Sequence, residues 1–270
     1  MGTNGQVRGM NVWPIDPAIP RAALVTGGGK RLGRAMALTL AEAGFAVAVH
    51  CLASAEAAQA TVADLRGLGV RAAVVHADLE REEDVAGLVA SAARELGPIG
   101  VLVNNASAFE RDEWDTADRA SWDRHIEPNL RAPFVLSQAF ARELPGDAVG
   151  VVVNMLDQRV WSPTPHFVSY AVSKAGLWAL TQSLALALAP RIRVNGIGPG
   201  PTLPSPRQSQ AQFDRQCAST PLARGASPAE IGRALLAILA LPSMTGQMIA
   251  LDGGQHLQWS AARGLDGPEE

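Results

Sequence analysis

The chain has 270 residues, of which 47% are apolar and 18% charged, and its formal net charge at pH 7 is −3. This length suits one domain or at most two, and the charge provides no basic surface of the kind that binds nucleic acid. No run of 18 apolar residues predicts a membrane span, and the first 20 residues lack the basic-then-apolar pattern of a signal peptide.

Residues that could bind a metal or form disulfides are few and scattered. Cys51 and Cys217 stand alone, without metal-binding or redox spacing, and the five histidines form no cluster along the chain. Isolated cysteines of this kind are typical of reduced thiols in the cytoplasm. We therefore expect a cytoplasmic protein that binds no metal and acts on a small molecule.

Short apolar segments alternate with longer helical patterns along most of the chain. Strands are expected over residues 21–26, 45–50, 70–76, 99–103, 150–153, 192–195 and 247–251, and helices over 34–43, 54–68, 82–96, 129–143 and 167–189. Near-continuous apolar strands that alternate with helices require a sheet covered on both faces, with right-handed crossovers. The pattern predicts an α/β Rossmann fold, doubly wound around a seven-stranded, mainly parallel sheet.

No internal repeat and no linker divides the chain. We expect one dinucleotide-binding and catalytic domain over residues 21–260, preceded by a flexible lead-in (1–20) and followed by a tail (261–270). The proline-rich segment 199–209 is long and irregular. Inside a domain such a loop is usually functional or mobile, so we expect it to act as a substrate lid.

A glycine-rich turn, Thr-Gly-Gly-Gly-Lys-Arg-Leu-Gly at 26–33, joins the first strand to the first helix. Backbone N–H groups at a helix start point outward, and the helix dipole favours an anion there. The first βα turn is the usual phosphate site of a Rossmann fold. The spacing departs from G-x-G-x-x-G, so an ordinary glycine-containing turn is the alternative.

The end of the second strand selects the nicotinamide cofactor. Enzymes that use NAD usually place Asp or Glu there, on the ribose hydroxyls, whereas residues 50–54 read His-Cys-Leu-Ala-Ser. With Lys30 and Arg31 nearby in the glycine turn, this acid-free end favours a 2′-phosphate and hence NADP(H). In the alternative interpretation, Lys30 and Arg31 are ordinary solvent-exposed side chains of the turn and bind no phosphate.

The only tyrosine, Tyr170, stands four residues before Lys174, one of two lysines against 21 arginines. A chain that otherwise uses arginine keeps a lysine where a compact ammonium is needed. At this helical spacing the phenol and the ammonium share one face. The pair is therefore a candidate catalytic site; an ordinary surface pair is the alternative.

Three motifs together, residues 26–33, Asn-Asn-Ala-Ser at 104–107 and Tyr170-x-x-x-Lys174, resemble the short-chain dehydrogenase/reductase superfamily. The resemblance spans roughly residues 21–254 and includes Asn-Gly-Ile-Gly-Pro-Gly at 195–200 and Asp-Gly-Gly at 252–254. It implies that Tyr170 donates a proton, that Lys174 eases this transfer and holds the nicotinamide ribose, and that Asn129 holds a relay water.

The resemblance also implies residues for the cofactor. Asp78 and Leu79 would flank the adenine, and Asn105 and Ala106 would line the cofactor cleft. The full expected cofactor set is Gly27, Lys30, Arg31, Leu32, Gly33, His50, Ser54, Asp78, Leu79, Asn105, Ala106, Ser107, Met155, Tyr170, Lys174, Pro199 and Gly200.

Asp157 stands thirteen residues before Tyr170, where the superfamily usually has a catalytic serine. A hydroxyl can donate to a neutral carbonyl, whereas a carboxylate would repel the developing alkoxide. A carboxylate suits a heterocycle with ring nitrogens and amino groups, where it can accept or relay protons. The alternatives are an enzyme that has lost its activity, or an aspartate turned away to cap a helix.

The same substitution resembles the pteridine reductases of the superfamily, as do Gly-Lys-Arg-Leu-Gly at 29–33 and Asn-Ala-Ser-Ala-Phe at 105–109. This resemblance implies that Phe109 stacks on a flat pterin and that Ser107 contacts both cofactor phosphate and pterin. Ser107, Phe109, Asp157 and Tyr170 form the expected substrate set, and the alternative for Phe109 is a loop anchor.

Pteridine reductases often carry an arginine after the second strand, and here Leu52 and Ala53 stand there instead. The NADPH preference therefore rests on Lys30, Arg31, His50 and Ser54.

We expect NADPH-dependent reduction of a pterin-type C=N bond. The alternatives are a carbonyl or 3-oxoacyl reductase of the same superfamily, and a nucleotide-binding protein without activity. Family members pair the helices expected over 129–143 and 167–189 across a two-fold axis, so we also expect a homotetramer.

Overall fold

Seven parallel strands form the centre of the computed structural model, which describes residues 14–258. All strand pairs in this range are parallel, in the order β3-β2-β1-β4-β5-β6-β7. The strands are β1 (Ala22–Val25), β2 (Ala46–Cys51), β3 (Ala72–His76), β4 (Val101–Asn104), β5 (Gly150–Met155), β6 (Ile192–Pro199) and β7 (Met248–Leu251). Each of the seven expected strands is confirmed.

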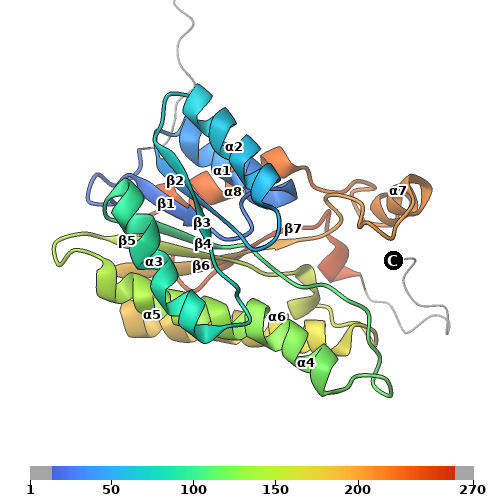
Figure 1. The fold of residues 1–270 in the computed structure, drawn as a ribbon. Helices are drawn as coiled ribbons and strands as arrows, with labels where there is room; N and C mark the ends of the chain where they lie inside the picture. The colour runs from blue at the N-terminus through green and yellow to red at the C-terminus, as the bar shows by residue number, and fades with distance from the viewer. Residues whose placement is uncertain (1–13, 259–270) are drawn as a thin grey trace, which may run out of the picture.

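Helices cover both faces of the sheet, as expected for the doubly wound fold (Figure 1). One face carries α1 (Arg31–Glu42), α2 (Ala55–Gly67) and α8 (Pro228–Ala240), and the other carries α3 (Glu82–Leu96), α5 (Ala132–Glu143) and α6 (Val168–Leu188). The remaining helices are α4 (Arg119–Ile126), α7 (Gln210–Ala218), the π-helical turn η1 (Glu127–Arg131) and the 3₁₀ turns η2 (Gln158–Val160) and η3 (Gln255–Leu257).

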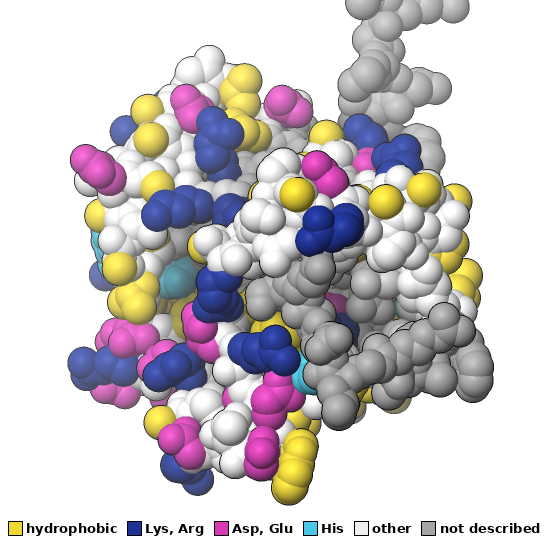
Figure 2. Space-filling view, turned by 90° about the vertical axis from the view of Figure 1, so that its right-hand side faces the viewer, with side chains coloured by type: hydrophobic (Ala, Val, Ile, Leu, Met, Phe, Trp, Pro, Cys, Tyr) yellow, Lys and Arg dark blue, Asp and Glu magenta, His cyan; other side chains and the backbone are white. Residues whose placement is uncertain are grey.

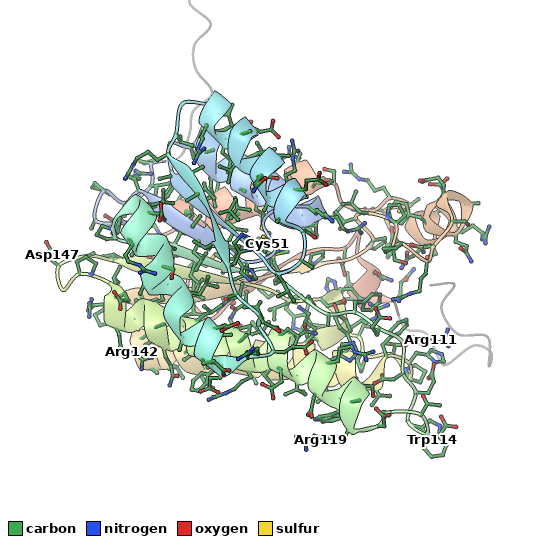
Figure 3. The ribbon with its side chains drawn as sticks, in the orientation of Figure 1. Cys51, Arg111, Trp114, Arg119, Arg142 and Asp147 are labelled. Carbon is green, nitrogen blue, oxygen red and sulfur yellow. The ribbon has the colours of Figure 1, made fainter. Side chains whose placement is uncertain are left out.

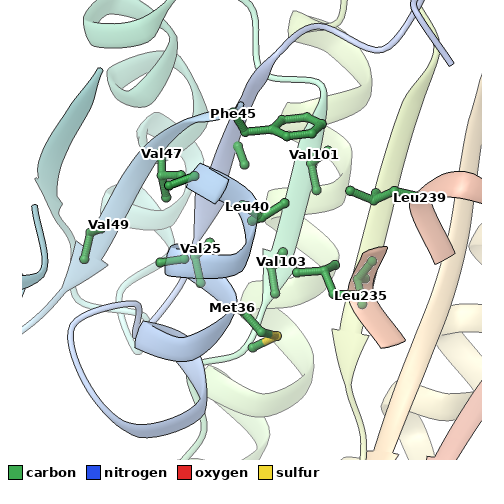
Figure 4. Packing of buried hydrophobic residues seen from close by; sticks show 14 of the residues in the cluster. Val25, Met36, Leu40, Phe45, Val47, Val49, Val101, Val103, Leu235 and Leu239 are labelled. Carbon is green, nitrogen blue, oxygen red and sulfur yellow. The ribbon is translucent and has the colours of Figure 1, made fainter. Parts of the chain in front are cut away.

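Valines on the central strands pack directly against the first helix. Val25 and Val103 are fully buried and lie against Met36 and Leu40 of α1, with Leu235 of α8 beside them (Figure 4). Burial of one such side chain stabilises the fold by roughly 1.5–3 kcal/mol. Because the sheet is buried on both faces, its strands need no alternation of apolar and polar residues.

Helix α1 begins at Arg31, before the expected start at residue 34, and the helices differ from expectation in two further places. The helix expected over 129–143 is preceded by α4 and by η1, so helical structure begins at Arg119. Pro128 and Pro133 lack an amide hydrogen, and the wider π turn between α4 and α5 accommodates them. In addition, α7 and α8 were not expected, although Ser227 and Glu230 form a capping box at the start of α8.

The lead-in expected over residues 1–20 is too long. Ile15 and Ile19 are buried in the same core as β1, and the Val149 amide donates to the Ala18 carbonyl across 3.1 Å. These apolar side chains join the domain because burial outweighs the freedom of a loose segment. Residues 1–13 and the expected tail, 261–270, lie outside the described residues.

Within residues 14–258 no helix is both long enough and apolar enough to cross a membrane. Both cysteines are free: Cys51 is buried at the end of β2, near the centre of the molecule (Figure 3), and Cys217 is partly buried on α7.

Candidate active site

Two adjoining clefts open at the carboxyl edge of the sheet, the edge where Rossmann folds bind ligands. The larger cleft has a volume of about 500 Å³ and the smaller one about 200 Å³. Arg31 and Leu32 line both, so the clefts meet at the glycine turn. Seen from the side of α7, Lys and Arg side chains are spread over this face with Asp and Glu between them (Figure 2).

The glycine turn borders the large cleft with backbone rather than side chains. A Cβ on Gly33 would lie 2.2 Å from the Gly27 carbonyl oxygen and 2.6 Å from Asn105 Nδ2, so only glycine fits there. Gly27 has φ +60°, and Arg31 shares this left-handed conformation with φ +50°. A non-glycine residue in that region costs roughly 1–2 kcal/mol, so the chain keeps an arginine at this position at the expense of stability.

The start of α1 is suited to a phosphate. Arg31, Leu32 and Gly33 occupy the first turn, where amide N–H groups have no intrahelical acceptor. No acidic residue lies in that turn, and the side chain of the N-cap residue, Lys30, makes no capping bond. The exposed N–H groups and the positive end of the dipole therefore face the large cleft.

His50 lines the large cleft, as expected for a cofactor-binding residue, and both of its ring nitrogens bond to backbone groups. Its Nδ1 accepts the Gly27 amide across 3.1 Å, and its Nε2 lies 3.1 Å from the carbonyl oxygen of Ala77, to which it donates. Burial lowers the pKa of His50 below its ordinary value. The ring is therefore neutral and fastens the glycine turn to the end of β3, so the positive charge expected beside a 2′-phosphate must come from Lys30 and Arg31.

Part of the expected cofactor set lines the same cleft, whereas Tyr170, Pro199 and Gly200 line the small cleft and Lys174 lines neither. Ser54 occupies the N-cap of α2 without a side-chain capping bond, and residues 50–54 place no acid on the cleft wall. The Thr26 hydroxyl accepts the amides of Asn105 and Ala106 at 2.9 and 3.0 Å, which holds their loop against the glycine turn. The cleft is completed by Asp78, Leu79 and Ser107.

Asp157 and Tyr170 meet in the small cleft. Asp157 Oδ2 accepts the phenol hydroxyl of Tyr170 across 2.9 Å. Its Oδ1 accepts the Arg159 amide across 2.8 Å, which caps η2. The carboxylate thus caps a helical turn, the alternative considered above, with one oxygen and holds the phenol with the other.

Arg159 is a residue of this site that the sequence did not reveal. Its Nη1 lies 3.3 Å from Asp157 Oδ2, and each side chain of the pair is only 13% exposed. Its guanidinium carbon lies 5.6 Å from the centre of the Phe109 ring. The one available signal was a cation two residues after the aspartate.

Lys174 lies behind the phenol and is buried. Its ammonium donates to the Met155 carbonyl across 2.8 Å and lies 5.8 Å from the centre of the Tyr170 ring. Burial lowers the pKa of Lys174 to about 8, and the nearby Asp157 carboxylate partly opposes that shift. Met155 does not line either cleft; it contributes its carbonyl to this lysine.

Asn129 lies in the π turn and its side chain does not face a cleft. Its Oδ1 accepts the Ala108 amide across 2.8 Å, while its Nδ2 donates to the Ala108 carbonyl and to Ser173 Oγ. Both amide hydrogens are therefore used within the protein. The side chain fastens the loop that carries Phe109, and a role for Asn129 in holding a relay water stays a prediction.

Phe109 forms part of an aromatic wall of the small cleft. Its ring stacks on Phe167, with 4.8 Å between centroids and 11° between planes, and meets Tyr170 edge-on at 4.7 Å. Phe167 covers one face of Phe109, so a flat substrate could stack only on the other. Ser107 lines the large cleft instead, with its hydroxyl bonded to the Ala108 carbonyl.

The segment expected as a lid lies across the small cleft. Pro199 and Gly200 line it, and the chain beyond them is irregular up to Ser209. Arg31 donates to the Leu203 carbonyl across 3.3 Å. Arg207 donates to the Phe109 carbonyl across 2.8 Å and pairs with Glu110. Two arginines thus connect the segment to opposite sides of the cleft.

No group of three or more His, Cys, Asp or Glu side chains in residues 14–258 is arranged to hold a metal ion.

The short chain dehydrogenase family profile matches residues 21–215. The chain belongs to the short-chain dehydrogenase family.

Relatives within this family differ in their activities. The 3-oxoacyl-(acyl-carrier-protein) reductase FabG of Staphylococcus aureus is 30% identical over 242 residues, which cover 88% of this chain and 98% of the relative. The solved structure of FolM alternative dihydrofolate reductase 1 from Brucella canis, complexed with NADP, is 47% identical with a TM-score of 0.88. It covers 92% of this chain and 99% of its own.

Two further solved structures have similar folds. FolM alternative dihydrofolate reductase 1 from Brucella suis, in complex with NADP, is 48% identical with a TM-score of 0.87, and the match covers 91% of this chain and 98% of its own. A blue fluorescent protein from a metagenomic library, in complex with NADPH, is 30% identical with a TM-score of 0.79 and covers 87% and 97%.

Proposed function

We propose that this short-chain dehydrogenase uses NADPH to reduce a pterin-type C=N bond in a dihydropterin or dihydrofolate. The observation that carries the proposal is the hydrogen bond from Tyr170 to Asp157, which puts a carboxylate where a serine is usual. The 47–48% identity to two proteins named alternative dihydrofolate reductase supports it.

The residues around the large cleft fit NADP(H). The amides of Arg31, Leu32 and Gly33 would hold the pyrophosphate. Arg31 and Lys30, with the Ser54 hydroxyl, would hold the 2′-phosphate, since no acid in residues 50–54 opposes it. Asp78 and Leu79 would flank the adenine, and Lys174 would hold the nicotinamide ribose.

When bound, the nicotinamide supplies the hydride, and the residues of the chain manage the proton. The Tyr170 hydroxyl proton lies between Oη and Asp157 Oδ2. Asp157 accepts hydrogen bonds at both oxygens, which suits the ionised carboxylate. Transfer of the phenol proton to a ring nitrogen leaves a phenolate, which the positive charge of Lys174, 5.8 Å from the centre of the Tyr170 ring, would stabilise.

The lining of the small cleft favours a polar heterocycle over an acyl chain. Its volume of about 200 Å³ is modest, and hydrogen-bonding side chains from five separate segments surround it, namely Arg31, Asp157, Gln158, Arg159, Thr202, Gln208, Gln216 and Gln255. The ring nitrogens, amino groups and ring carbonyl of a heterocycle can pair with these side chains. A hydrocarbon acyl chain in the cleft would leave the same side chains without hydrogen-bond partners. Phe109 adds an aromatic face for a flat ring.

Reduction of a 3-oxoacyl thioester is the second candidate, favoured by the 30% identity to FabG over 88% of the chain. A substrate panel separates the two. Turnover with NADPH would be measured for dihydropterins, dihydrofolate, a 3-oxoacyl thioester and a simple ketone. The proposal predicts the highest kcat/KM for a pterin or folate. Turnover confined to the thioester or ketone would overturn it.

A further inference from the structure

A buried network of hydrogen-bonded polar side chains, here called the polar network, lies behind the aromatic wall of the small cleft. It consists of Asp112 on the loop after Phe109, Ser169 on α6 and His125 on α4, which are 5%, 0% and 0% exposed. The polar network ends at the backbone amide of Glu110, which donates to His125 Nε2 across 3.0 Å. None of these three side chains lines either cleft.

The donor and acceptor of every hydrogen bond in this polar network follow from the chemistry of the groups that form it. The Asp112 carboxylate accepts the Ser169 amide and the Ser169 hydroxyl, so the hydroxyl hydrogen points at Asp112. The Ser169 oxygen must then accept from His125 Nδ1, which lies 2.6 Å away. The carbonyl oxygen of Ser121 lies 3.0 Å from the same nitrogen. A carbonyl oxygen accepts and never donates, so this contact also requires a hydrogen on Nδ1.

His125 is therefore held as the neutral tautomer with its hydrogen on Nδ1. That leaves a lone pair on Nε2, which the Glu110 amide requires. Burial lowers the pKa of His125 below its ordinary value, although Asp112 and Glu110 oppose the shift and Arg124 adds to it. A protonated ring would present a donor to the donor at Glu110 and break the contact.

This pattern also excludes a hydrolase triad. In such a triad the histidine accepts the serine hydrogen and so activates the oxygen. Here the histidine donates to Ser169, and the serine hydrogen is bound to Asp112. All three side chains are buried, so no substrate reaches the hydroxyl.

The polar network is connected to both Phe109 and Tyr170, the two aromatic residues that line the small cleft. Glu110 follows Phe109, and Ser169 precedes Tyr170. The His125 ring meets the Tyr170 ring edge-on, 6.0 Å away. The Asp112 carbonyl accepts the amide of Phe167, whose φ of +58° is a costly conformation for a bulky residue. Asp112 thus caps the start of α6 from a distant loop.

We infer that Asp112, Ser169 and His125 are positioning residues that fix the separation of Phe109 and Tyr170, and hence the width of the small cleft. The inference rests on the proposed function only in taking Phe109 and Tyr170 as walls of the substrate cleft. It assigns a substrate-positioning role to a serine and a histidine that touch no ligand.

The first test needs no substrate. Long-range ¹H–¹⁵N spectra of protein labelled at histidine nitrogens report the tautomer, and His125→Asn assigns the signal. We expect the Nδ1–H tautomer at neutral pH. An Nε2–H tautomer or an imidazolium at His125 would overturn the inference. In Ser169→Ala, exchange of the Glu110 amide hydrogen should accelerate roughly tenfold or more; unchanged exchange would also count against it.

The second test separates positioning from general stability. Ser137→Ala is the matched control, because Ser137 is a buried helical serine on α5 whose hydroxyl bonds only to the Pro133 carbonyl within its own helix. We expect Ser169→Ala to raise the substrate KM roughly three- to tenfold, the scale of one lost hydrogen bond. The KM for NADPH should stay within about twofold, because the large cleft is built by other residues.

Equal changes in both KM values, or equal effects of Ser169→Ala and Ser137→Ala, would show a merely structural role and overturn the inference. The kinetic test uses whichever substrate the unmutated enzyme turns over best. If that substrate is not a pterin, the proposed function fails while the tautomer, exchange and KM tests of this inference still stand.

Discussion

Tyr170 and Asp157 are joined by a hydrogen bond of 2.9 Å between the phenol oxygen and Oδ2, and Arg159 Nη1 lies 3.3 Å from the same carboxylate oxygen. A serine at position 157 would present a donor to a substrate oxygen. The carboxylate instead presents acceptors, which can pair with amino and N–H groups of a substrate. We therefore expect this one exchange to change which substrate edge the site can recognise.

Removal of the phenol oxygen tests the proton donor. Tyr170→Phe keeps the aromatic packing against Phe109 and should leave the fold and NADPH affinity unchanged. We expect kcat to fall by ~10²-fold or more, the usual scale for a general acid. Near-normal turnover by this variant, with cofactor binding checked by fluorescence titration, would rule out the Tyr170–Lys174 assignment.

The pH dependence should follow Lys174. Its pKa is lowered to about 8, so the charged form is lost as the pH rises through that value, and kcat/KM should decline there. The Asp157 carboxylate raises the pKa of Lys174. In Asp157→Asn the alkaline decline should therefore begin at lower pH. A decline that stays in place or moves to higher pH would contradict this coupling.

Cofactor choice should depend on Arg31. NADPH should bind more tightly than NADH, and Arg31→Gly should narrow that preference roughly tenfold, the scale of one charged hydrogen bond. Glycine is the suitable replacement because φ at this position is +50°. Arg34→Ala is the control, since Arg34 pairs with Asp64 and lines neither cleft. Equal Michaelis constants for NADPH and NADH in the unmutated protein would refute the argument from the absence of an acid in residues 50–54.

The fold could be predicted from the sequence because its signals are local. Each strand is a short apolar run, and β1 leads directly into the glycine turn, so the strands and the cofactor site at that turn could be predicted, whereas the order of the strands was not. The helical structure before Asn129 was missed because Pro128 interrupts the helical pattern there, and in the fold Pro128 lies in the π turn η1.

Contacts between distant residues limited the prediction of the site. His50 was expected at the cofactor site, but the sequence did not reveal that both ring nitrogens bond to backbone groups that only the folded sheet brings near. The bond between His125 and Ser169 joins residues 44 apart in sequence, and neither lies in a recognised motif. Asp157 and Tyr170 were found because the family spacing names both positions.

Assembly is the fourth expectation. Val172 and Leu186 on α6 are 42% and 83% exposed in the single chain, although both are apolar. We predict a homotetramer with closed symmetry, in which α6 contributes to an interface. Light scattering at micromolar concentration should give a mass near four times 28.3 kDa. A monomer would contradict this prediction, and Leu186→Glu should shift the population toward smaller species if α6 lies in the interface.

Phe109 provides a matched comparison for the role of Asp157. Phe109→Ala removes an aromatic face from the small cleft, so flat heterocycles should bind more weakly while small ketones are little affected. Asp157→Ser restores the hydroxyl that is usual in the family. It should lower pterin reduction while carbonyl reduction is kept or increased, because only interactions stronger in the transition state accelerate the reaction.

The most direct measurement is therefore the ratio of kcat/KM for a dihydropterin to kcat/KM for a 3-oxoacyl thioester, with NADPH, in the unmutated protein and in Asp157→Ser. Our account predicts a ratio well above one in the unmutated protein and a fall of at least roughly tenfold in the variant, the loss of one charge-assisted hydrogen bond. A ratio below one in the unmutated protein, or the same ratio in both proteins, would contradict the claim that Asp157 directs this enzyme to pterins.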